Sequence, residues 1–585
     1  MEDPKLAYYL KLRSNILLEG DVSLAEEEAK HFFESVTRVF APSIVRDVIG
    51  LPETIADLHA RGCQPIGFIA RGTLYTMEML VLQFNFVQEI WRRYTPEDDE
   101  LIGRVPWVTR ITYGEADFIC AVPLMAAGEI LSQSNLTQTT QETLRALVTF
   151  LATGRQGKFH LVKPNGGSTS TQHVHGLHAY KAKFFPRLIR SLIVTSLPSL
   201  PRTPAGNVSL LDPFVGSGTA LVEGSMLGFE SHGIDIDKLS CAISQAKLDA
   251  LRLDQKFLSQ SIAELSSLIE LSQEDEGYTF PPIIAKKFDR KGKVDEKRMY
   301  EVSIARWKRA ITGIANPDAR RLFEICLSDA LTRKFNVRMM GTGVGRFALE
   351  VSKKSIDSIM RSNLSNLLRA ASVAKTIVEG YGLRLAPSSV RSANAAKLPY
   401  EPGRFSLIVT SPPYLPASSG REDYLVGKLI SITALGLMSE EEIHHVETES
   451  IGSMKSTPPA GDGLPDSVHK LYNWLLTDSL RSIKAQPILA YYEGLKKALE
   501  ESYRVLLPNG LAIYVIGKES VFYTYRTREV LYRVPCDDIF GELATSCGFI
   551  VEKRVDVELD KKNRNARPRS MDKYYESIFF LRKPR

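Results

Sequence analysis

The stretch Ser209-Leu-Leu-Asp-Pro-Phe-Val-Gly-Ser-Gly-Thr-Ala-Leu-Val-Glu223 decides the fold that the sequence predicts. Its first apolar residues favour a β-strand that runs into Asp212, and the chain then turns through Gly216 and Gly218 into a helix. Two glycines let the backbone pass close to a bound ligand, where a Cβ atom would clash. Seventeen residues beyond Gly218, a second strand ends at Asp235. This succession of strand, glycine-rich turn, helix and strand predicts a βαβ unit of an α/β fold.

The acidic residues at the two strand ends indicate the kind of ligand. A lone Gly-x-Gly is a weak signal, and neither the fuller dinucleotide pattern Gly-x-Gly-x-x-Gly nor the Gly-Lys-Ser/Thr of a phosphate-binding loop follows here. A carboxylate at Asp212 instead suits a ligand with a cationic amino group. Asp235 stands where α/β folds hold ribose hydroxyls.

A second stretch, Ser406-Leu-Ile-Val-Thr-Ser-Pro-Pro-Tyr414, carries the predicted chemistry. A buried strand delivers Ser411 and its neighbours at its carboxyl end, the edge of an open α/β sheet where ligands bind. One substrate that would suit such residues is the exocyclic amine of a nucleic-acid base. This amine is a poor nucleophile because its lone pair is conjugated with the ring of the base. The Ser411 hydroxyl and the Pro412 carbonyl are acceptors for its two N–H groups, and successive prolines fix their direction. Tyr414 can stack on the base.

Several motifs carry a resemblance to a known family. DPFVGSGTALVEG followed by GIDID resembles motifs I and II of the S-adenosylmethionine-dependent DNA amino-methyltransferases, and Leu177-His-Ala-Tyr-Lys-Ala-Lys-Phe-Phe-Pro186 is similar to their motif X. Ser392-Ala-Asn-Ala-Ala-Lys-Leu398 resembles motif III, with Asn where the family usually has Asp. The resemblance implies S-adenosyl-L-methionine as the cofactor. The cofactor-binding residues that it implies are Lys183, Phe184, Asp212, Pro213, Phe214, Gly216, Ser217, Gly218, Thr219, Asp235 and Asn394.

The sequence SPPY looks like the catalytic motif IV of the same family. By this resemblance the catalytic residues are Ser411, Pro412, Pro413 and Tyr414. The Ser form is most typical of N4-cytosine enzymes, whereas the adenine-N6 enzymes more often have Asp or Asn at that position. The methyltransferase domain would comprise residues 163–254 and 383–585. The implied fold is a Rossmann-like, seven-stranded α/β sheet with helices on both faces and an antiparallel last strand.

Two patterns compete with this interpretation. Pro-Pro-Tyr is also found in polyproline peptides that bind WW domains, but such peptides lie in exposed segments and do not directly follow a strand. Val534-Pro-Cys536 resembles the Pro-Cys of cytosine-C5 methyltransferases, whose cysteine attacks the base. That cysteine would follow the fourth strand, where SPPY already stands. Cys536 is therefore predicted to be structural, at the start of a helix.

The 585 residues exceed one ordinary domain, and the part before the methyltransferase motifs predicts a domain of its own. Residues 1–150 favour an α+β domain, in which Leu6–Leu12 is a strand and Ser23 with Glu26 forms a capping box that opens a helix. Polar and glycine-rich residues between Ser134 and Thr171 predict a linker. This domain is faintly similar to the N-terminal domains of tRNA guanine-N2 methyltransferases.

Residues 255–382 predict a mainly helical insertion between the two parts of the methyltransferase domain. Eighteen Lys and Arg stand against eight Asp and Glu from Lys286 to Lys354, whereas the rest of the chain carries a net charge of −4. Such a basic block indicates a surface for a polyanion and makes the insertion a candidate for nucleic-acid binding or target recognition. The alternative is a solvated helical face with incidental charge.

Other features of the sequence exclude some classes of protein. No apolar run approaches the roughly 18 residues of a membrane span, and the start MEDPKLAYYLKLRS lacks the apolar region of a secretory signal. The six cysteines are scattered without a Cys-x-x-Cys pair, which predicts a cytoplasmic protein with reduced thiols. His173, His175 and His178 could suggest a metal, but the cysteines offer no second pair of ligands. No metal is predicted, and His178 is assigned to the cofactor lid.

Taken together, the sequence predicts a methyltransferase that modifies an exocyclic amino group in double-stranded DNA, with cytosine N4 favoured. A base in a duplex must be flipped out to reach such a pocket. The family also implies a cognate restriction or defence component as a partner. Three alternatives stay open: an adenine-N6 DNA methyltransferase, a tRNA guanine-N2 methyltransferase, and a silent nucleic-acid-binding scaffold. The intact motif residues argue against the scaffold; these are Asp212, Gly216, Gly218, Ser411 and Tyr414.

Overall fold

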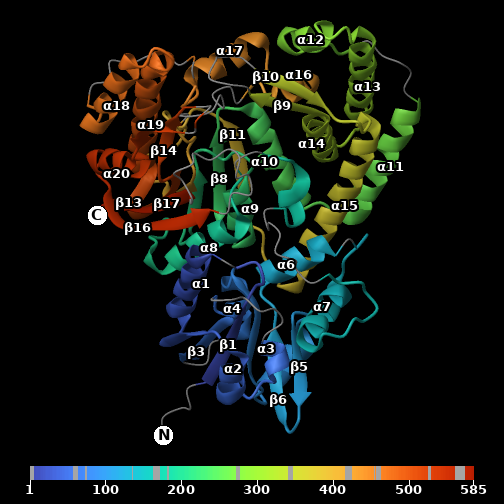
Figure 1. The fold of residues 1–585 in the computed structure, drawn as a ribbon. Helices are drawn as coiled ribbons and strands as arrows, with labels where there is room; N and C mark the ends of the chain where they lie inside the picture. The colour runs from blue at the N-terminus through green and yellow to red at the C-terminus, as the bar shows by residue number, and fades with distance from the viewer. Residues whose placement is uncertain are drawn as a thin grey trace.

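The computed structural model places an N-terminal domain below a larger α/β domain, with the helical insertion along one side of the latter (Figure 1). The structure describes residues 6–16, 18–56, 64–72, 76–134, 136–162, 171–180, 183–271, 277–339, 347–415, 425–453, 455, 463–524, 527, 529–559 and 574–585. The predicted start of the methyltransferase domain, Lys163, lies outside these residues.

The larger domain is built on a seven-stranded sheet in the order β11-β8-β7-β12-β13-β17-β16. The first five of these strands are mutually parallel, and β17 is antiparallel to both β13 and β16. This confirms the predicted fold, including its antiparallel last strand. The strands are β7 (Ser209–Asp212), β8 (Glu230–Asp235), β11 (Ser388–Ser392), β12 (Phe405–Thr410), β13 (Leu506–Gly517), β16 (Ile550–Leu559) and β17 (Tyr574–Arg582).

Helices cover both faces of this sheet because successive side chains of a strand point to opposite faces. On β7, Leu210 belongs to the apolar cluster that includes α9 and α10, whereas Leu211 belongs to the cluster that includes α19 and α20. Both leucines are fully buried, so the strand is apolar on each side. The flanking helices are α8 (Pro186–Ser196), α9 (Thr219–Met226), α10 (Lys238–Ala250), α19 (Ala485–Val505) and α20 (Cys536–Ser546).

The N-terminal domain contains a six-stranded antiparallel sheet in the order β2-β3-β1-β4-β6-β5. Its strands are β1 (Leu6–Leu12), β2 (Ser35–Val39), β3 (Gly67–Gly72), β4 (Val87–Arg93), β5 (Val108–Tyr113) and β6 (Ala116–Ala121). Its helices are α1 (Glu19–Phe32), α2 (Pro42–Ile49), α3 (Glu53–Ala56), α4 (Met77–Gln83), α5 (Asp98–Arg104), α6 (Leu124–Gln133) and α7 (Gln141–Thr153). The predicted strand at β1 has the bounds that the sequence indicated.

Two local predictions in this region are wrong. The helix α1 begins at Glu19 and not after Ser23, whose hydroxyl donates to Glu19 Oε1 one turn earlier at 3.3 Å. Glu26 pairs with Lys30 and Arg38 and caps nothing. The supposed linker contains α7, which opens with a capping box at Thr140. Its apolar positions every three to four residues pack into the core, so Gln141–Thr153 is not a linker. The glycine-rich part of the predicted linker, residues 163–170, lies outside the described residues.

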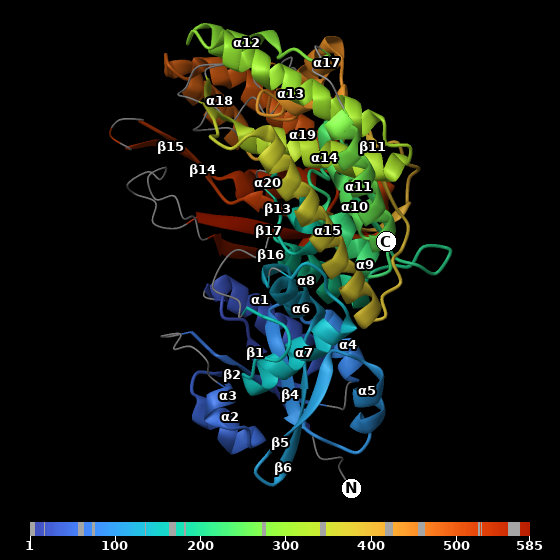
Figure 2. The ribbon, with the colours of Figure 1, turned by 90° about the vertical axis from the view of Figure 1, so that its right-hand side faces the viewer.

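The insertion comprises α11 (Gln255–Leu271), α12 (Pro282–Asp289), α13 (Val294–Thr312), α14 (Pro317–Lys334), the antiparallel hairpin of β9 (Phe335–Met339) and β10 (Phe347–Val351), and α15 (Ile356–Gly380). Figures 1 and 2 show α15 running from the insertion down to the N-terminal domain. The Thr139 backbone N–H donates to Ser372 Oγ at 2.8 Å, and the Tyr381 hydroxyl donates to the Val122 carbonyl at 2.6 Å. One continuous apolar cluster therefore joins the three regions.

The remaining elements are helices and one further hairpin. They are η1 (His173–Leu177), η2 (Leu197–Ser199), α16 (Leu429–Leu435), α17 (Glu440–Glu449), α18 (Asp466–Thr477), η3 (Ser482–Lys484) and the hairpin of β14 (Ser520–Tyr523) and β15 (Val530–Val534), where η denotes a 3-10 helix. Within the part of the chain that the structure describes, none of the helices has the length and apolar character to span a bilayer.

Candidate functional site

The two decisive sequence stretches meet at the centre of the sheet. The strand order reverses between β7 and β12, because β8 and β11 continue to one side and β13 to the other. Such a switch point leaves a crevice at the carboxyl ends of the strands, where ligands bind in open α/β sheets. Asp212 ends β7 and Thr410 ends β12, and the Thr410 hydroxyl donates to Asp212 Oδ1 at 2.6 Å. The predicted cofactor and base residues therefore share one edge.

Asp212 is a buried carboxylate. Only 2% of its surface is exposed, and its Oδ1 also accepts from the Phe214 backbone N–H at 3.1 Å. Burial raises the pKa of Asp212 to about 7, although the hydrogen bond from Thr410 opposes the change. The carboxylate is thus poised to gain a cationic neighbour, because a positive charge would stabilise its ionised form.

The glycine-rich turn has the tight geometry that the sequence predicted. Gly216 and Gly218 have φ angles of 48° and 77°, which favour glycine. A Cβ atom at Gly218 would stand 2.9 Å from Ser244, and one at Gly216 would stand 3.4 Å from the Tyr180 hydroxyl oxygen. The Gly216 backbone N–H donates to Asp235 Oδ2 at 3.0 Å, so the turn is bonded to the end of the next strand.

Asp235 begins a polar network that also holds Lys428. Asp235 Oδ1 accepts from the Asp237 backbone N–H at 3.0 Å, and the Asp237 carboxylate accepts from Lys428 Nζ at 2.6 Å. Lys428 Nζ also lies 3.2 Å from Ser240 Oγ and 3.4 Å from the hydroxyl of Tyr180. Burial and the charge of Asp237 raise the pKa of Asp235. Burial alone would raise the pKa of Asp237 too, but Lys428 holds it below its usual value.

The SPPY motif follows β12 directly and is held from two sides. Ser411 and Pro413 are half-buried, Pro412 is buried, and Tyr414 keeps 37% of its surface exposed. The Tyr491 hydroxyl, from α19, donates to the Pro413 carbonyl at 2.9 Å. The Tyr414 hydroxyl donates to Glu576 Oε1 at 2.8 Å, from β17. An exposed aromatic ring beside a fixed backbone can receive a planar ligand.

The other predicted cofactor residues lie around the same turn. Pro213, Phe214 and Ser217 form the turn itself, and Thr219 starts α9. The Ser217 carbonyl accepts from Lys247 Nζ at 2.6 Å. Of the seven residues 213–219, Thr219 is notable because its buried hydroxyl has no hydrogen-bond partner among the residues described. An unpaired buried hydroxyl is a place where a polar ligand atom can bind.

Lys183, Phe184 and Asn394 lie at the borders of the predicted cofactor site. Burial lowers the pKa of Lys183 to about 8, and its Nζ donates to the His175 carbonyl. Phe184 is half-buried against the main core. Asn394 follows β11, beside Asp235, and its Oδ1 already accepts from the Ala396 backbone N–H at 2.9 Å. One acceptor site of that oxygen is therefore used by the protein.

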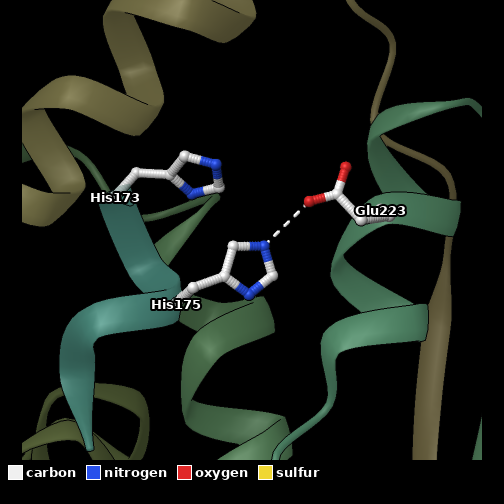
Figure 3. Close-up of side chains that lie close together, drawn as sticks. All are labelled: His173, His175 and Glu223. Atoms are coloured by element: carbon white, nitrogen blue, oxygen red, sulfur yellow. Dashed lines mark hydrogen bonds and ion pairs between the residues drawn. The ribbon is translucent and has the colours of Figure 1, made fainter. Parts of the chain in front are cut away.

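The structure places two of the three neighbouring histidines against a residue that the sequence did not connect with them. His173, His175 and Glu223 lie together, and the His175 Nε2 atom is 2.8 Å from Glu223 Oε1 (Figure 3). The other carboxylate oxygen of Glu223 is 3.2 Å from Arg190 Nη1. Because the Arg190 guanidinium already compensates the charge of the Glu223 carboxylate, no metal ion is needed to balance that charge.

His178 is separate from that cluster. Its Nε2 lies 2.9 Å from Ser328 Oγ of α14, and the neighbouring Ala179 backbone N–H donates to Asp329 at 2.7 Å. The predicted lid segment is thus fastened to the helical insertion. Burial lowers the pKa of His178 to about 3, so the ring is neutral at physiological pH.

Cys536 lies at the start of α20, as the sequence predicted. Burial raises the pKa of the Cys536 thiol to about 12, so almost none of it is thiolate at neutral pH. A cysteine that attacks a base needs its thiolate form. This environment therefore agrees with a structural role.

The arginines at the centre of the basic insertion have structural partners. Arg320 donates twice to the Ile314 carbonyl, at 3.0 and 2.6 Å. Arg321 pairs with Asp249 of α10 at 2.6 Å and with Asp318 at 2.5 Å. Arg321 thus holds α14 against α10 of the α/β domain, whereas Arg320 binds the segment that precedes α14. By contrast, Lys286 in the last turn of α12 and Lys291 just after that helix are exposed.

Sequence reasoning missed the residues that join these segments: Thr410, Tyr180, Lys428, Tyr491 and Glu576. Thr410 lies in the stretch Ser406–Tyr414 and Tyr180 in the stretch Leu177–Pro186. Both stretches were assigned to the site, so the position of these two residues could have indicated that they belong to it. Tyr491 and Glu576 come from α19 and β17, which the motifs do not include, and Lys428 lies in the stretch VGKLISITALGL after SPPY, which is also similar to the family. No local pattern in the sequence singles them out.

Comparisons with known proteins find two methyltransferases with similar sequences. No protein-family model matches the chain. It is 24% identical to the Type II methyltransferase M.MvaI of Kocuria varians over 407 residues, which cover 64% of this chain and 82% of that protein. It is also 41% identical to the Type II methyltransferase M.MjaII of Methanocaldococcus jannaschii over 78 residues, which cover only 13% of either protein.

Two solved structures were also compared with the chain. TrmN from Thermus thermophilus matches with 10% identity over 99% of both chains and a TM-score of 0.29. The rRNA methyltransferase aviRa from Streptomyces viridochromogenes matches with 10% identity over 70% of this chain and 87% of its own, with a TM-score of 0.25.

Proposed function

We propose that this protein is an S-adenosylmethionine-dependent methyltransferase that modifies an exocyclic amino group of a base in DNA, namely N4 of cytosine. The sequence similarity to two Type II methyltransferases supports methyl transfer. The observation that carries the proposal is the contact between Thr410 and Asp212, which places the SPPY motif beside the glycine-rich turn. A methyl donor on that turn and an amine at SPPY would therefore be neighbours.

The residues of the turn fit the cofactor. Gly216 and Gly218 leave backbone space that a Cβ atom would fill, and the unpaired Thr219 hydroxyl faces no protein partner among the described residues. Asp212 would attract the cationic amino group of the methionine part. Asp235 would hold the ribose hydroxyls. When bound, S-adenosylmethionine supplies a methyl group activated by its sulfonium.

On the base side, the chain orients the nucleophile. The Ser411 hydroxyl and the Pro412 carbonyl would accept the two N–H groups of the amine, which draws its lone pair out of conjugation. Tyr414 would stack on the base through its exposed ring. The base would be flipped out of the duplex to reach this position. Ser at position 411 favours cytosine over adenine, by resemblance to the N4-cytosine enzymes.

The test is to incubate the purified protein with S-adenosylmethionine and duplex DNA and to analyse the nucleosides by mass spectrometry. The proposal expects N4-methylcytosine and no 5-methylcytosine. N6-methyladenine would correct the base and leave the mechanism in place, whereas 5-methylcytosine would contradict it. Total RNA incubated in parallel should gain no methyl groups. Methylation of RNA alone would replace DNA as the substrate.

A matched pair of variants tests the roles within the motif. Ser411→Ala should abolish most methyl transfer, whereas Cys536→Ala should retain it, because the thiol lies outside the proposed chemistry. Full activity in Ser411→Ala would refute the assignment. The Type II relatives also suggest a cognate endonuclease, and protection of modified DNA from cleavage by that endonuclease would identify it.

A further inference from the structure

Two neighbouring residues of the insertion, Ser328 and Asp329 of α14, hold the segment that follows η1. The His178 Nε2 atom lies 2.9 Å from Ser328 Oγ, and the Ala179 backbone N–H donates to Asp329 Oδ1 at 2.7 Å. Ser328 and Asp329 are buried, with only 0% and 1% of their surface exposed. Residues that are 150 positions apart in the chain therefore meet in two consecutive contacts inside the molecule.

The same turn of α14 also holds α16. The Ser431 hydroxyl donates to the Ser328 carbonyl at 3.3 Å. Helix α16 directly follows Lys428, which pairs with Asp237 and lies 4.9 Å from the centroid of the Tyr180 ring. One turn of the insertion thus contacts the two segments that bring Tyr180 and Lys428 to the predicted cofactor site.

Tyr180 connects these contacts with the glycine-rich turn. Its hydroxyl oxygen stands 3.4 Å from the position that a Cβ atom at Gly216 would take, and 3.1 Å from Ser240 Oγ. Because Ala179 and Tyr180 are joined by one planar peptide unit, a displacement of Ala179 also displaces the tyrosine. The position of Tyr180 against the turn therefore depends on the bond between Ala179 and Asp329.

Asp329 is the stronger of the two anchors. A carboxylate that accepts from a backbone N–H forms a charge-assisted hydrogen bond, which is roughly twice as strong as a bond between neutral groups. Arg333, one turn further along α14, pairs with the other carboxylate oxygen at 2.5 Å and compensates the charge. Both oxygens of Asp329 thus have partners, and the direction of the carboxylate is fixed before any ligand binds.

We propose that Asp329, with Ser328 beside it, is a positioning residue of the cofactor site: by accepting from the Ala179 N–H it holds Tyr180 against the glycine-rich turn where S-adenosylmethionine binds. This inference rests on the proposed function. It makes the insertion a part of the cofactor site, whereas the sequence indicated only a surface for nucleic acid.

A matched pair of variants at position 329 tests this bond. Asp329→Ala removes the acceptor, whereas Asp329→Asn keeps an oxygen for the Ala179 N–H. Calorimetric titration of the full chain with S-adenosylmethionine should show roughly tenfold weaker binding for Asp329→Ala, about the loss of one hydrogen bond. Asp329→Asn should recover most of that affinity. Ser328→Ala removes the hydroxyl beside His178 and should weaken binding on the order of fivefold.

Steady-state methylation of DNA separates an effect on the cofactor site from a general loss of activity. In Asp329→Ala the KM for S-adenosylmethionine should rise about tenfold, while kcat at saturating cofactor and the KM for DNA keep their parent values. The control is Asp318→Ala, which removes a carboxylate of the same helix that binds Arg321. This control should keep the parent affinity and the parent KM. Thermal unfolding of each variant checks that it is folded.

The outcomes distinguish this inference from the proposed function. A parent protein that binds no S-adenosylmethionine overturns both. If the parent binds it and methylates DNA, but Asp329→Ala and Ser328→Ala keep the parent affinity, the inference is overturned and the proposed function stands. The inference also fails if Asp329→Asn binds as weakly as Asp329→Ala, because the acceptor then plays no part. A fall in kcat with an unchanged KM for the cofactor would overturn it as well.

Discussion

Replacing Asp212 by Asn should stabilise the protein at alkaline pH. The ordinary pKa of the group is 3.8, and burial raises it to about 7 in the folded state. The folded protein therefore binds a proton that the unfolded chain releases, and its stability falls as the pH rises from about 4 to 7. Above pH 7 the whole penalty is present. Asn cannot ionise, and its Oδ1 can still accept from Thr410 and from the Phe214 N–H.

The magnitude follows from the interval between the two pKa values. About three pH units at roughly 1.4 kcal/mol each give a penalty of about 4 kcal/mol at pH 8. At pH 5 the penalty is only about 1.5 kcal/mol. The stability of Asp212→Asn relative to the parent should therefore improve by about 2.5 kcal/mol between pH 5 and pH 8.

Urea denaturation of the two proteins at pH 5 and pH 8, without cofactor, measures this difference. The parent should lose stability between the two values, and the variant should lose less. If the difference between variant and parent is the same at both pH values, Asp212 does not titrate in this interval and the reasoning is refuted. In the same variant, calorimetry should show that S-adenosylmethionine affinity is lost, because the cationic amino group loses its partner.

Three further predictions concern the rest of the site. Ser411→Ala should lower the single-turnover rate on the order of 10²–10³-fold, with little change in DNA affinity. Tyr414→Ala should weaken capture of the flipped base by about 1–3 kcal/mol, which 2-aminopurine fluorescence would report. Lys428→Met should lower the free energy of unfolding in urea by about 2–3 kcal/mol because it leaves Asp237 unpaired, and Lys428→Arg should not. Reversing Lys286 and Lys291 to Glu should reduce the salt slope of DNA binding by about 2 if the insertion contacts phosphates, and an unchanged slope would make it a solvated surface.

The basic insertion shows where charge in a sequence misleads. Arg320 and Arg321 stand together in the basic block, so charge alone would make them candidates for phosphate contacts. Their partners, the Ile314 carbonyl and the carboxylates of Asp249 and Asp318, make them structural. Reversing them to Glu would disturb the packing of α14, so loss of DNA binding in that variant would prove nothing. Lys286 and Lys291 are chosen for the DNA-binding test because their side chains are exposed, and not only because they belong to the basic block.

The central sheet was predictable from the sequence because its signals are local. The strand ending at Asp212, the turn through Gly216 and Gly218, and the strand before Ser411 each follow from short-range patterns of apolar residues and glycine. The helix α1 was placed five residues late because a Ser-x-x-Glu pattern outside a helix start is indistinguishable from a capping box. The segment containing α7 was judged by its polar composition, although its apolar spacing was helical.

The contacts that complete the site could not be predicted in this way. Lys428 reaches Asp237 across 191 positions of the chain, and Tyr414 reaches Glu576 across 162. Such pairs depend on which strands become neighbours in the sheet, a property of the whole topology. A motif contains the residues that contact a ligand, whereas the residues that hold the motif in place can lie anywhere else in the sequence.

The contact between α15 and the N-terminal domain has a consequence for synthesis of the chain. Thr139 bonds to Ser372, and Trp107 stacks on Tyr381 with ring centroids 5.9 Å apart. At 5–20 residues per second, a ribosome needs roughly 10 to 50 seconds to add the residues that separate these partners. During that time the nascent N-terminal domain exposes apolar surface that α15 will later cover. A ribosome that stalled within the insertion would therefore hold a domain with its core still open.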